Sequence, residues 1–170
     1  DAAEGLVDLD LQIAYEAQRA KCATAVLLNK WDISTLDLDM ATARIKAKVQ
    51  TKPRWLTVSA LTGRGIDRIL PLARELHGQY SDRIPTAELN RWLEDLRSRR
   101  PPSAKGGKSI KTFYMVQYGA SPPRFKVMVN SRALVNKPFA YYLENRLRED
   151  YGFWGIPLVI DFEGKEERYS

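Results

Sequence analysis

The sequence contains very few residues of the types that bind transition metals or form cross-links. Cys22 is its only cysteine and His77 its only histidine among 170 residues. One cysteine cannot form a disulfide within the chain, which fits the reducing conditions of the cytosol. One cysteine and one histidine are also too few for a zinc site, so we expect neither a metal site nor a cysteine–histidine catalytic pair.

The chain also lacks long apolar runs. No apolar stretch approaches the ~20 residues that a membrane-spanning helix needs, and no charged leader followed by an apolar core opens the sequence. The composition, 44% hydrophobic and 28% charged, is ordinary for a soluble globular protein. We therefore expect a cytoplasmic protein with no membrane span, folded as one domain or two small ones.

Acidic residues are missing from the long segment between Asp95 and Glu144. Residues 1–82 hold 11 basic and 11 acidic residues, whereas residues 83–170 hold 16 basic and 10 acidic ones and so carry the whole net charge of +6. A long basic segment is the electrostatic signature of a protein that binds a polyanion. We call this segment the basic window; its ten basic residues are Arg97, Arg99, Arg100, Lys105, Lys108, Lys111, Arg124, Lys126, Arg132 and Lys137.

Residues 1–82 alternate between helical and strand patterns. Apolar spacing predicts helices over 8–21, 38–50 and 66–79, and Pro71 fits the last one only in an early turn or at a kink. Continuous apolar runs predict buried strands over 23–28 and 55–60. This alternation predicts an α/β fold with a parallel sheet. The expected apolar stripes are Leu9, Ile13, Ala17 and Ala20, then Met40, Ile45 and Val49, then Ile66, Ile69, Leu70, Ala73 and Leu76.

Residues 83–170 follow a different pattern, which predicts a small α+β domain. Strict alternation over 124–130 places Phe125, Val127 and Val129 inward and Arg124, Lys126 and Asn130 outward. The order α-β-β-α-β predicts three strands with helices on one face. We therefore predict two domains, 1–82 and 83–170. In the second domain, helices are expected over 86–98 and 138–150, and Thr86 is expected to be the N-cap of the first. A basic loop is expected over 99–109. Strands are expected over 110–118, 124–130 and 156–162.

Two short motifs end the two predicted strands of the first half. "NKWD", residues 29–32, follows the strand at 23–28, and "SAL", residues 59–61, ends the strand at 55–60. Ligands bind at strand carboxyl ends in α/β sheets. The Asp32 carboxylate can accept hydrogen bonds from both N1–H and N2–H₂ of guanine, a pairing that adenine cannot reproduce. Asn29 can brace the base edge or a neighbouring loop, the Lys30 stem can pack over the purine, and the Ala60 N–H can donate to O6. The alternative for either motif alone is an ordinary polar turn, and the pairing of the two favours a guanine site.

The two motifs resemble the fourth and fifth motifs of a translation-factor-class GTPase domain. "DAAEGLVDLDLQIA" resembles the segment after the third GTPase motif of the Der (EngA) family. "RIPTAELNRWL" resembles the junction into that family's C-terminal KH-like domain, and "PPRFKVMVN" and "GIPLVIDFEGKE" resemble strands of that domain. The resemblance covers essentially the whole chain. It implies part of an α/β P-loop GTPase domain, the second of two in tandem, followed by an α+β KH-like domain.

The resemblance also implies the ligands and partners. Proteins of this family act in assembly of the large ribosomal subunit. The expected partners are therefore that subunit with its rRNA and the remaining GTPase domains of the same chain. The expected GTP- or GDP-binding residues are Asn29, Lys30, Trp31, Asp32, Ser59, Ala60 and Leu61. The basic window supplies candidate RNA contacts at Lys105, Lys108, Lys111, Arg124 and Lys126.

The sequence departs from a complete GTPase in one respect. No G-x-x-x-x-G-K-[ST] phosphate loop occurs in it, because "GGKS" at 106–109 has Pro102 where the leading glycine would stand. "DFEG" at 161–164 has the D-x-x-G spelling of the magnesium-side motif, but we do not assign it that role because it follows the nucleotide half. The phosphate loop cradles the phosphates and helps to hold Mg²⁺. We therefore expect no catalytic residue here, no GTP hydrolysis by these 170 residues alone, and Mg²⁺ only in a longer parent GTPase. The alternative is a stand-alone RNA- or protein-binding module whose GTPase remnant is structural.

The KH-like part departs from RNA-binding KH domains as well. Those domains clamp the RNA backbone with a G-x-x-G loop between two helices. "GFWG", residues 152–155, has these letters but lies between a predicted helix and a predicted strand. We therefore expect the basic surface, rather than that loop, to contact structured RNA or the neighbouring GTPase domain.

Overall fold

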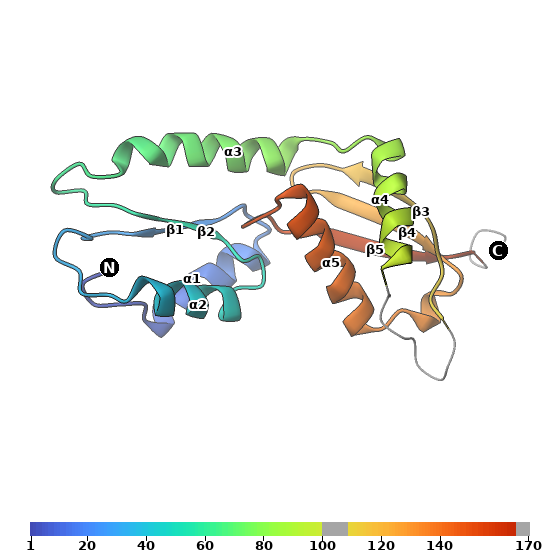
Figure 1. The fold of residues 1–170 in the computed structure, drawn as a ribbon, viewed down its shortest axis with the longest axis horizontal. Coiled ribbons are helices and arrows are strands. Elements are labelled where there is room, and N and C mark those ends of the chain that lie inside the picture. The colour runs from blue at the N-terminus through green and yellow to red at the C-terminus, as the bar shows by residue number, and fades with distance from the viewer. Residues whose placement is uncertain (100–108, 166–170) are drawn as a thin grey trace. The chain divides into compact units, whose positions relative to one another are not determined.

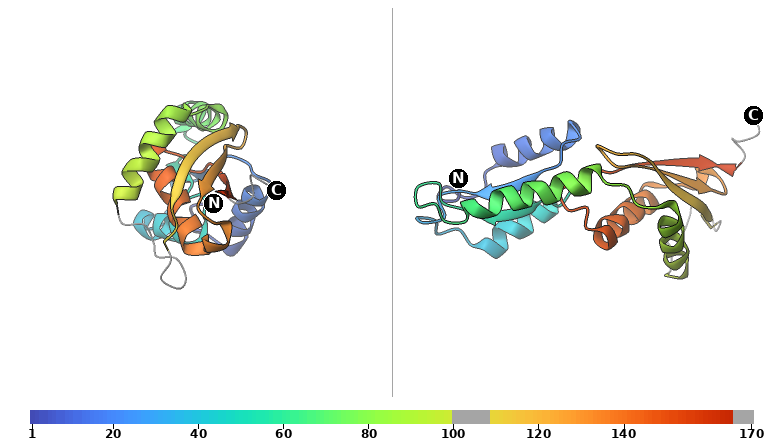
Figure 2. Two further views of the ribbon diagram at one scale, coloured as in Figure 1. Left: turned by 90° about the vertical axis from the view of Figure 1, so that its right-hand side faces the viewer. Right: turned by 90° about the horizontal axis from the view of Figure 1, so that it is seen from above.

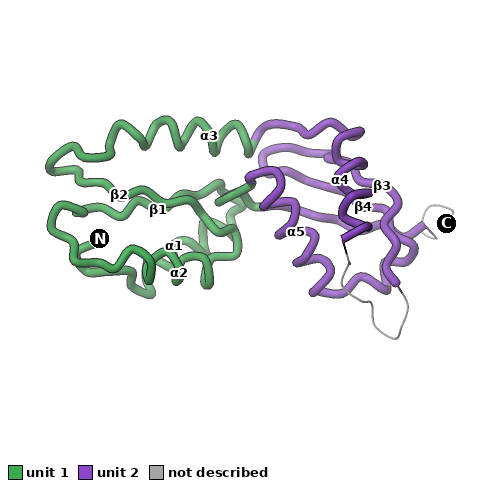
Figure 3. Tube along the Cα trace, viewed as in Figure 1, with its two compact units in different colours: residues 1–80, 153–157 green, residues 81–152, 158–170 purple. Residues whose placement is uncertain are grey.

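A computed structural model describes residues 1–99 and 109–165 (Figure 1). The chain divides into two compact units (Figure 3). Unit 1 comprises residues 1–80 and 153–157, and unit 2 comprises residues 81–152 and 158–170. Within the described ranges, no helix is both long and apolar enough to cross a membrane.

Unit 1 is built on a two-stranded parallel sheet, as the alternating pattern predicts. The strands pair in register from Ala25 opposite Arg54 to Leu28 opposite Thr57. Helix α3 runs along one side of this sheet, and α1 and α2 run along the other (Figure 1). The elements in order are α1 (Asp8–Arg19), β1 (Ala25–Leu28), α2 (Leu38–Lys48), β2 (Arg54–Thr57), η1 (Ile66–Arg68) and α3 (Ile69–Ser81).

The apolar stripes of unit 1 are only partly those expected. Ile45 and Val49 are buried as predicted, but Met40 is 69% exposed because α2 turns Ala41 and Thr42 inward instead. Helix α3 starts after a 3₁₀ turn, which places Pro71 in its first turn. Its buried residues are Leu72 and Leu76, and Leu70 is exposed. Helix α1 buries no residue against the described parts of the chain, and its predicted stripe is open at Leu9 and Ile13.

Unit 2 has the predicted order α-β-β-α-β, with helices on one face of a three-stranded sheet. Strand β4 lies in the centre, antiparallel to β3 and parallel to β5. Helices α4 and α5 lie on the same side of the sheet (Figure 2). The elements are α4 (Thr86–Ser98), β3 (Thr112–Gly119), β4 (Arg124–Val129), η3 (Arg132–Leu134), α5 (Lys137–Tyr151) and β5 (Val159–Gly164).

The core of unit 2 follows the predicted alternation. Phe125, Val127 and Val129 of β4 are fully buried on the helix-covered face. Leucines of the two helices cover them: Leu89, Leu93 and Leu96 from α4, and Leu143 and Leu147 from α5.

The first turns of the two helices in unit 2 are capped differently. The prediction that Thr86 caps α4 was wrong, since Pro85 holds the N-cap position and contributes no side-chain hydrogen bond. A proline at this boundary has no backbone N–H, so one fewer donor there needs an acceptor. Helix α5 is capped by Asn136, whose Oδ1 accepts from the Phe139 N–H at 2.9 Å, with Pro138 in the first turn as predicted.

One arginine lies wholly inside unit 2. Arg148 of α5 has no exposed surface and donates to Glu144, one turn earlier, at 2.7 Å. Burial lowers the pKa of Arg148 from its ordinary value, and the Glu144 carboxylate opposes that change. A buried charge of this kind is tolerated only with its partner, because loss of one member leaves the other uncompensated.

Residues 153–157 belong to unit 1, although they lie between α5 and β5 in sequence. Strand β5 consequently begins at Val159 rather than at 156. The Gly155 N–H donates to the Thr51 oxygen at 2.8 Å, and the Gly155 oxygen accepts from the Thr24 N–H at 2.9 Å. These bonds join the segments that lead into β2 and β1. Gly155 has a φ of +79°, and a Cβ there would lie 2.1 Å from the Thr24 oxygen, so only glycine fits.

We predict that Gly155→Ala destabilises unit 1 far more than Gly63→Ala does. Both glycines have a similar positive φ, but a Cβ on Gly63 meets nothing within 4 Å. Gly63→Ala therefore carries only the left-handed backbone penalty of about 1–2 kcal/mol. Gly155→Ala adds a backbone clash and should lower the free energy of unfolding by roughly 3 kcal/mol or more. Equal losses in urea titrations of the two variants would contradict the close approach at Thr24.

Candidate functional site

The ends of β1 and β2 remain paired beyond the strands themselves. The Val58 N–H donates to the Leu28 oxygen at 3.0 Å, and the Trp31 N–H donates to the Val58 oxygen at 3.1 Å. This continuation carries the parallel register into both motifs. The "NKWD" and "SAL" residues therefore emerge side by side at the carboxyl end of the sheet.

A side-chain hydrogen bond joins the two motifs directly. Asn29 Oδ1 accepts from the Ala60 N–H at 3.1 Å. Of the two roles predicted for the Asn29 amide, the structure shows the bracing of a neighbouring loop. The Ala60 N–H, predicted as a donor to guanine O6, is thus already engaged, and any second acceptor would share it with Asn29.

The loop after β2 is held tightly by its own backbone. Ser59 is fully buried, and its N–H donates to the Arg64 oxygen at 2.9 Å while its oxygen accepts from the Gly63 N–H at 2.9 Å. Its Oγ accepts from the Thr62 N–H at 3.2 Å. Gly65 closes the loop with a φ of +74°, where a Cβ would lie 2.6 Å from the Thr57 oxygen. The loop therefore presents Ala60 and Leu61 in a fixed position.

The remaining motif residues face solvent. Asp32 is exposed and makes no hydrogen bond or ion pair with the described residues, so both carboxylate oxygens are open to a ligand. Leu61 is 88% exposed and Trp31 is half-buried. Lys30 has a φ of +60° and forms an ion pair with Asp1. An open carboxylate beside a fixed loop with an exposed apolar side chain can hold a flat base by its polar edge and one face.

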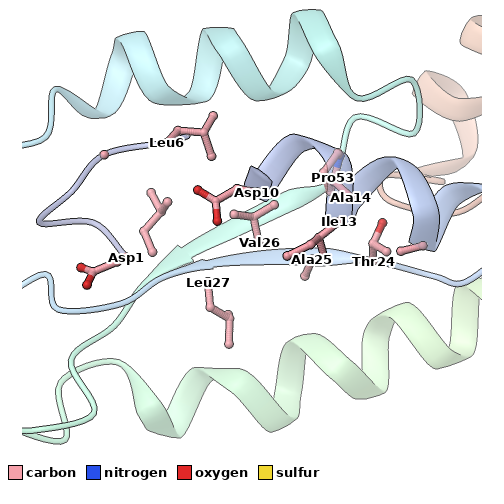
Figure 4. A pocket seen from close by; sticks show the side chains of 13 residues that line it. Asp1, Leu6, Asp10, Ile13, Ala14, Thr24, Ala25, Val26, Leu27 and Pro53 are labelled. Atoms are coloured by element: carbon pink, nitrogen blue, oxygen red, sulfur yellow. The ribbon is translucent and has the colours of Figure 1, made fainter. Parts of the chain in front are cut away.

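A separate hollow of about 240 Å³ lies between α1 and β1 (Figure 4). Its lining is mostly apolar and includes Ile13, Val26 and Leu27, with Asp1 and Asp10 as its charged residues. None of the seven predicted guanine-binding residues lines it. The hollow is therefore separate from these seven residues, and only Asp1, which pairs with Lys30, adjoins both.

The predicted RNA contacts fall into two groups. Lys105 and Lys108 lie outside the described residues. Lys111, Arg124 and Lys126 are described and exposed. Arg124 and Lys111 form no ion pair with described residues, whereas Lys126 Nζ lies 3.1 Å from Glu163 Oε2.

The pairing of β5 with β4 changes the charge around Lys126. In the parallel register, Asp161 lies opposite Lys126 and Glu163 lies opposite Met128. The basic window lacks acidic residues in sequence, but β5 brings two carboxylates beside it in space. Lys126 is thus partly neutralised, and Arg132, exposed and without an ion pair to described residues, is a basic group that the predicted contact set missed.

The "GFWG" string has a structural explanation within the described chain. Gly152 is the left-handed C-cap of α5, with a φ of 72° and its N–H donating to the Arg148 oxygen. Gly155 makes the close contact with Thr24 described above. The two glycines therefore serve a helix end and a backbone contact, between a helix and a strand.

Comparisons with known proteins find similar sequences for nearly the whole chain. Residues 83–163 match the family described as KH-domain-like of EngA bacterial GTPase enzymes, C-terminal. The whole chain is similar to proteins named GTPase Der. It is 38% identical to that of Chloroflexus aggregans over 175 residues, 34% identical to that of Desulforudis audaxviator over 174, and 37% identical to that of Ruegeria sp. strain TM1040 over 177.

The alignments cover nearly all of this chain but a minor part of each relative. They include 99% of this chain in all three cases, and 39%, 40% and 35% of the respective relatives. The chain thus spans about two-fifths of the length of the curated relatives it matches.

We predict that Asn29→Ala loosens the loop that follows β2, whereas Asn29→Asp does not. Alanine removes the acceptor for the Ala60 N–H, while aspartate retains an oxygen at the same place. Loss of one such bond is worth about 1 kcal/mol, so hydrogen exchange at the Ala60 amide should quicken roughly fivefold in Asn29→Ala. An exchange rate unchanged from the parent would show that Asn29 does not hold this loop.

Proposed function

We propose that this chain, which belongs to the GTPase Der (EngA) family, carries the guanine-reading half of a GTP-binding domain. The parent protein, in this proposal, hydrolyses GTP, as the name of its relatives says of them. The observation that carries the proposal is the open carboxylate of Asp32, which lies on the same sheet edge as the loop that Asn29 braces.

Guanine would bind to this edge through complementary polar groups. The Asp32 carboxylate accepts from N1–H and N2–H₂, two adjacent donors that adenine lacks. The Ala60 N–H donates to O6 while it remains shared with Asn29. The alkyl stem of Lys30 and the exposed side chain of Leu61 cover the base plane, and the half-buried Trp31 and buried Ser59 hold the two backbones in place.

GTP hydrolysis requires groups that act on the phosphates. Stabilisation of the transferred γ-phosphoryl group comes from a phosphate loop and Mg²⁺, and that loop is absent from this sequence. Among the described residues, no three acidic, histidine or cysteine side chains gather where they could hold a metal ion. The residues of this chain therefore select the base, and the 170 residues alone are inactive in this proposal.

We predict that Asp32→Asn in the full-length protein exchanges guanine binding for xanthine binding. The amide offers one acceptor and one donor, and xanthine carries an oxygen where guanine carries its amino group. Affinity for GDP at this site should fall at least tenfold, since each hydrogen bond to a charged group is worth about 1.5–3 kcal/mol. Binding of labelled xanthosine diphosphate, which the parent protein should bind poorly, should appear.

The matched control is Asp39→Asn. Asp39 lies in the first turn of α2, and its exposed carboxylate has no partner among the described residues. This change removes the same charge without altering the proposed site and should leave both affinities unchanged. Unaltered GDP binding in Asp32→Asn, measured by equilibrium titration, would refute the base-reading role.

The second part of the proposal is that unit 2 contacts ribosomal RNA of the large subunit. The supporting observations are the basic excess of residues 83–170 and the exposed Arg124 and Lys111, which form no ion pair with described residues. Unpaired surface cations neutralise phosphates without first breaking an ion pair.

We predict that Arg124→Ala and Lys111→Ala each lower the salt dependence of large-subunit association by about one unit of the log–log slope. Lys126→Ala should change the slope less, because Glu163 already pairs with Lys126. Lys46 is an exposed residue of α2 in unit 1, and Lys46→Ala is the control that should leave the slope unchanged. If both test variants fold normally and keep the parent slope, the basic window serves contact with the rest of the chain or solubility instead.

A further inference from the structure

Aromatic side chains lie exposed on the sheet of unit 2. In the β3–β4 register, Tyr114 lies opposite Met128 and Val116 opposite Lys126, so these four residues alternate with the buried Phe125, Val127 and Val129 and share the other face. Helices α4 and α5 leave that face of the sheet uncovered (Figure 2). Tyr114 is 42% exposed and Tyr118 is 44% exposed. Large aromatic side chains left open on a sheet are a feature of surfaces that bind a partner. We call this the open sheet face.

A network across all three strands fixes the position of one of these rings. The Tyr118 hydroxyl donates to Asp161 Oδ2 of β5 at 2.5 Å. Between them, Lys126 Nζ of β4 lies 6.0 Å from the centroid of the Tyr118 ring and pairs with Glu163. The ring is therefore anchored at its hydroxyl while part of its surface stays open. Anchoring of this kind lowers the entropy lost when a ligand stacks.

A hollow of about 340 Å³ opens beside this network. Its size is within the ~300–1,000 Å³ range of small-ligand sites. The ring of Tyr118, the cations Lys126 and Arg132, and the carboxylates Asp161 and Glu163 line this hollow, together with Phe162. Arg132 is exposed and has no ion pair with described residues, so its guanidinium is available to an anion.

Strand β3 carries a third exposed ring. Phe113, 47% exposed, has Lys165 Nζ at 5.7 Å from its centroid. Tyr114 and Tyr118 are four residues apart, which is about 13 Å along a strand. In an RNA-recognition motif, aromatic side chains on a sheet likewise stack two or three bases.

We propose that the open sheet face binds unpaired nucleotides of RNA by stacking their bases on Tyr114 and Tyr118. Arg132 and Arg124 neutralise the adjoining phosphates, and the carboxylates of Asp161 and Glu163 accept from base amino groups. The proposal rests on the RNA contact proposed above and adds the surface and the form of RNA that it takes.

The mixture of charges on this face favours a single strand over a duplex. A duplex hides its bases and presents phosphates, which Asp161 and Glu163 would repel. An unpaired strand can direct its bases to the rings and carboxylates and its phosphates to the arginines. An acidic protein segment would meet the same repulsion and has no flat base to place on the two tyrosines.

The experiment measures binding of a short, mixed-sequence, fluorescently labelled single-stranded RNA to the full-length protein. Tyr118→Leu and Tyr114→Leu remove each ring while they keep apolar volume. Each should weaken binding on the order of tenfold, with the salt slope unchanged, because a stacked base carries no net charge. Tyr118→Phe keeps the ring and should retain most of the affinity. Tyr141→Leu, a tyrosine 52% exposed on α5, is the matched control and should have no effect.

Further arms separate the possible occupants. The parent protein should bind the single strand more tightly than an RNA duplex. Tyrosine variants that bind the RNA as well as the parent would overturn the stacking proposal. If they also lose large-subunit association, the face binds a protein. If Lys111→Ala still reduces the salt slope, the RNA contact itself survives and only its assignment to this face fails.

Discussion

The parallel, in-register pairing of β1 with β2 is the constraint on which the candidate nucleotide site depends. It brings the ends of two strands, separated in sequence by a helix, to one edge. The ladder runs past the strands to Trp31 and Val58, so the motifs cannot slide relative to one another. A shift of β1 by one residue would exchange the positions of Leu28, which is buried, and Leu27, which is 41% exposed. The hydrophobic core therefore also holds the relative position of Asn29 and Ala60.

The bond between Asn29 and the Ala60 N–H turns this edge into a preformed surface. Without it, the loop after β2 would depend on its internal bonds at Ser59 and on the glycine turn at Gly65. A base that meets a loop already in place loses less entropy on binding than one that must order it. This lower entropy cost explains physically why Asn29 and a tightly turned loop would lie next to the open carboxylate of Asp32. Asn29 would thus act by holding the loop, and Asp32 by contact with the base.

Local patterns in the sequence predict the elements better than they predict the buried faces. The elements over 86–98 and 124–130 are almost as expected, because leucine spacing and strict alternation reflect burial on a single face. The stripes through Met40 and Leu70 failed because these residues lie off the i,i+4 rows that the helices bury, Ala41 with Ile45 in α2 and Leu72 with Leu76 in α3. Strand β5 begins late because Gly155 bonds to Thr24 and Thr51, residues more than a hundred positions away. Such long-range contacts leave no periodic signal in sequence.

For the candidate site, residue order placed both motifs at strand ends, but only the structure shows that Asn29 engages Ala60.

The same limit applies to charge. A run of sequence without acidic residues describes a basic surface only if no other segment lies beside it. Strand β5 is parallel to β4, and the crossover through α5 returns the chain with Asp161 and Glu163 next to Lys126. The open sheet face is therefore mixed in charge. Of its cations without an ion pair to described residues, Arg124 lies opposite Gly119 of β3, and Arg132 lines the same hollow as Tyr118. A surface of uniform positive charge favours phosphates in any arrangement. A surface that alternates cations, rings and carboxylates favours a ligand whose own phosphates, ring faces and amino groups alternate, and an unpaired nucleotide strand has that order.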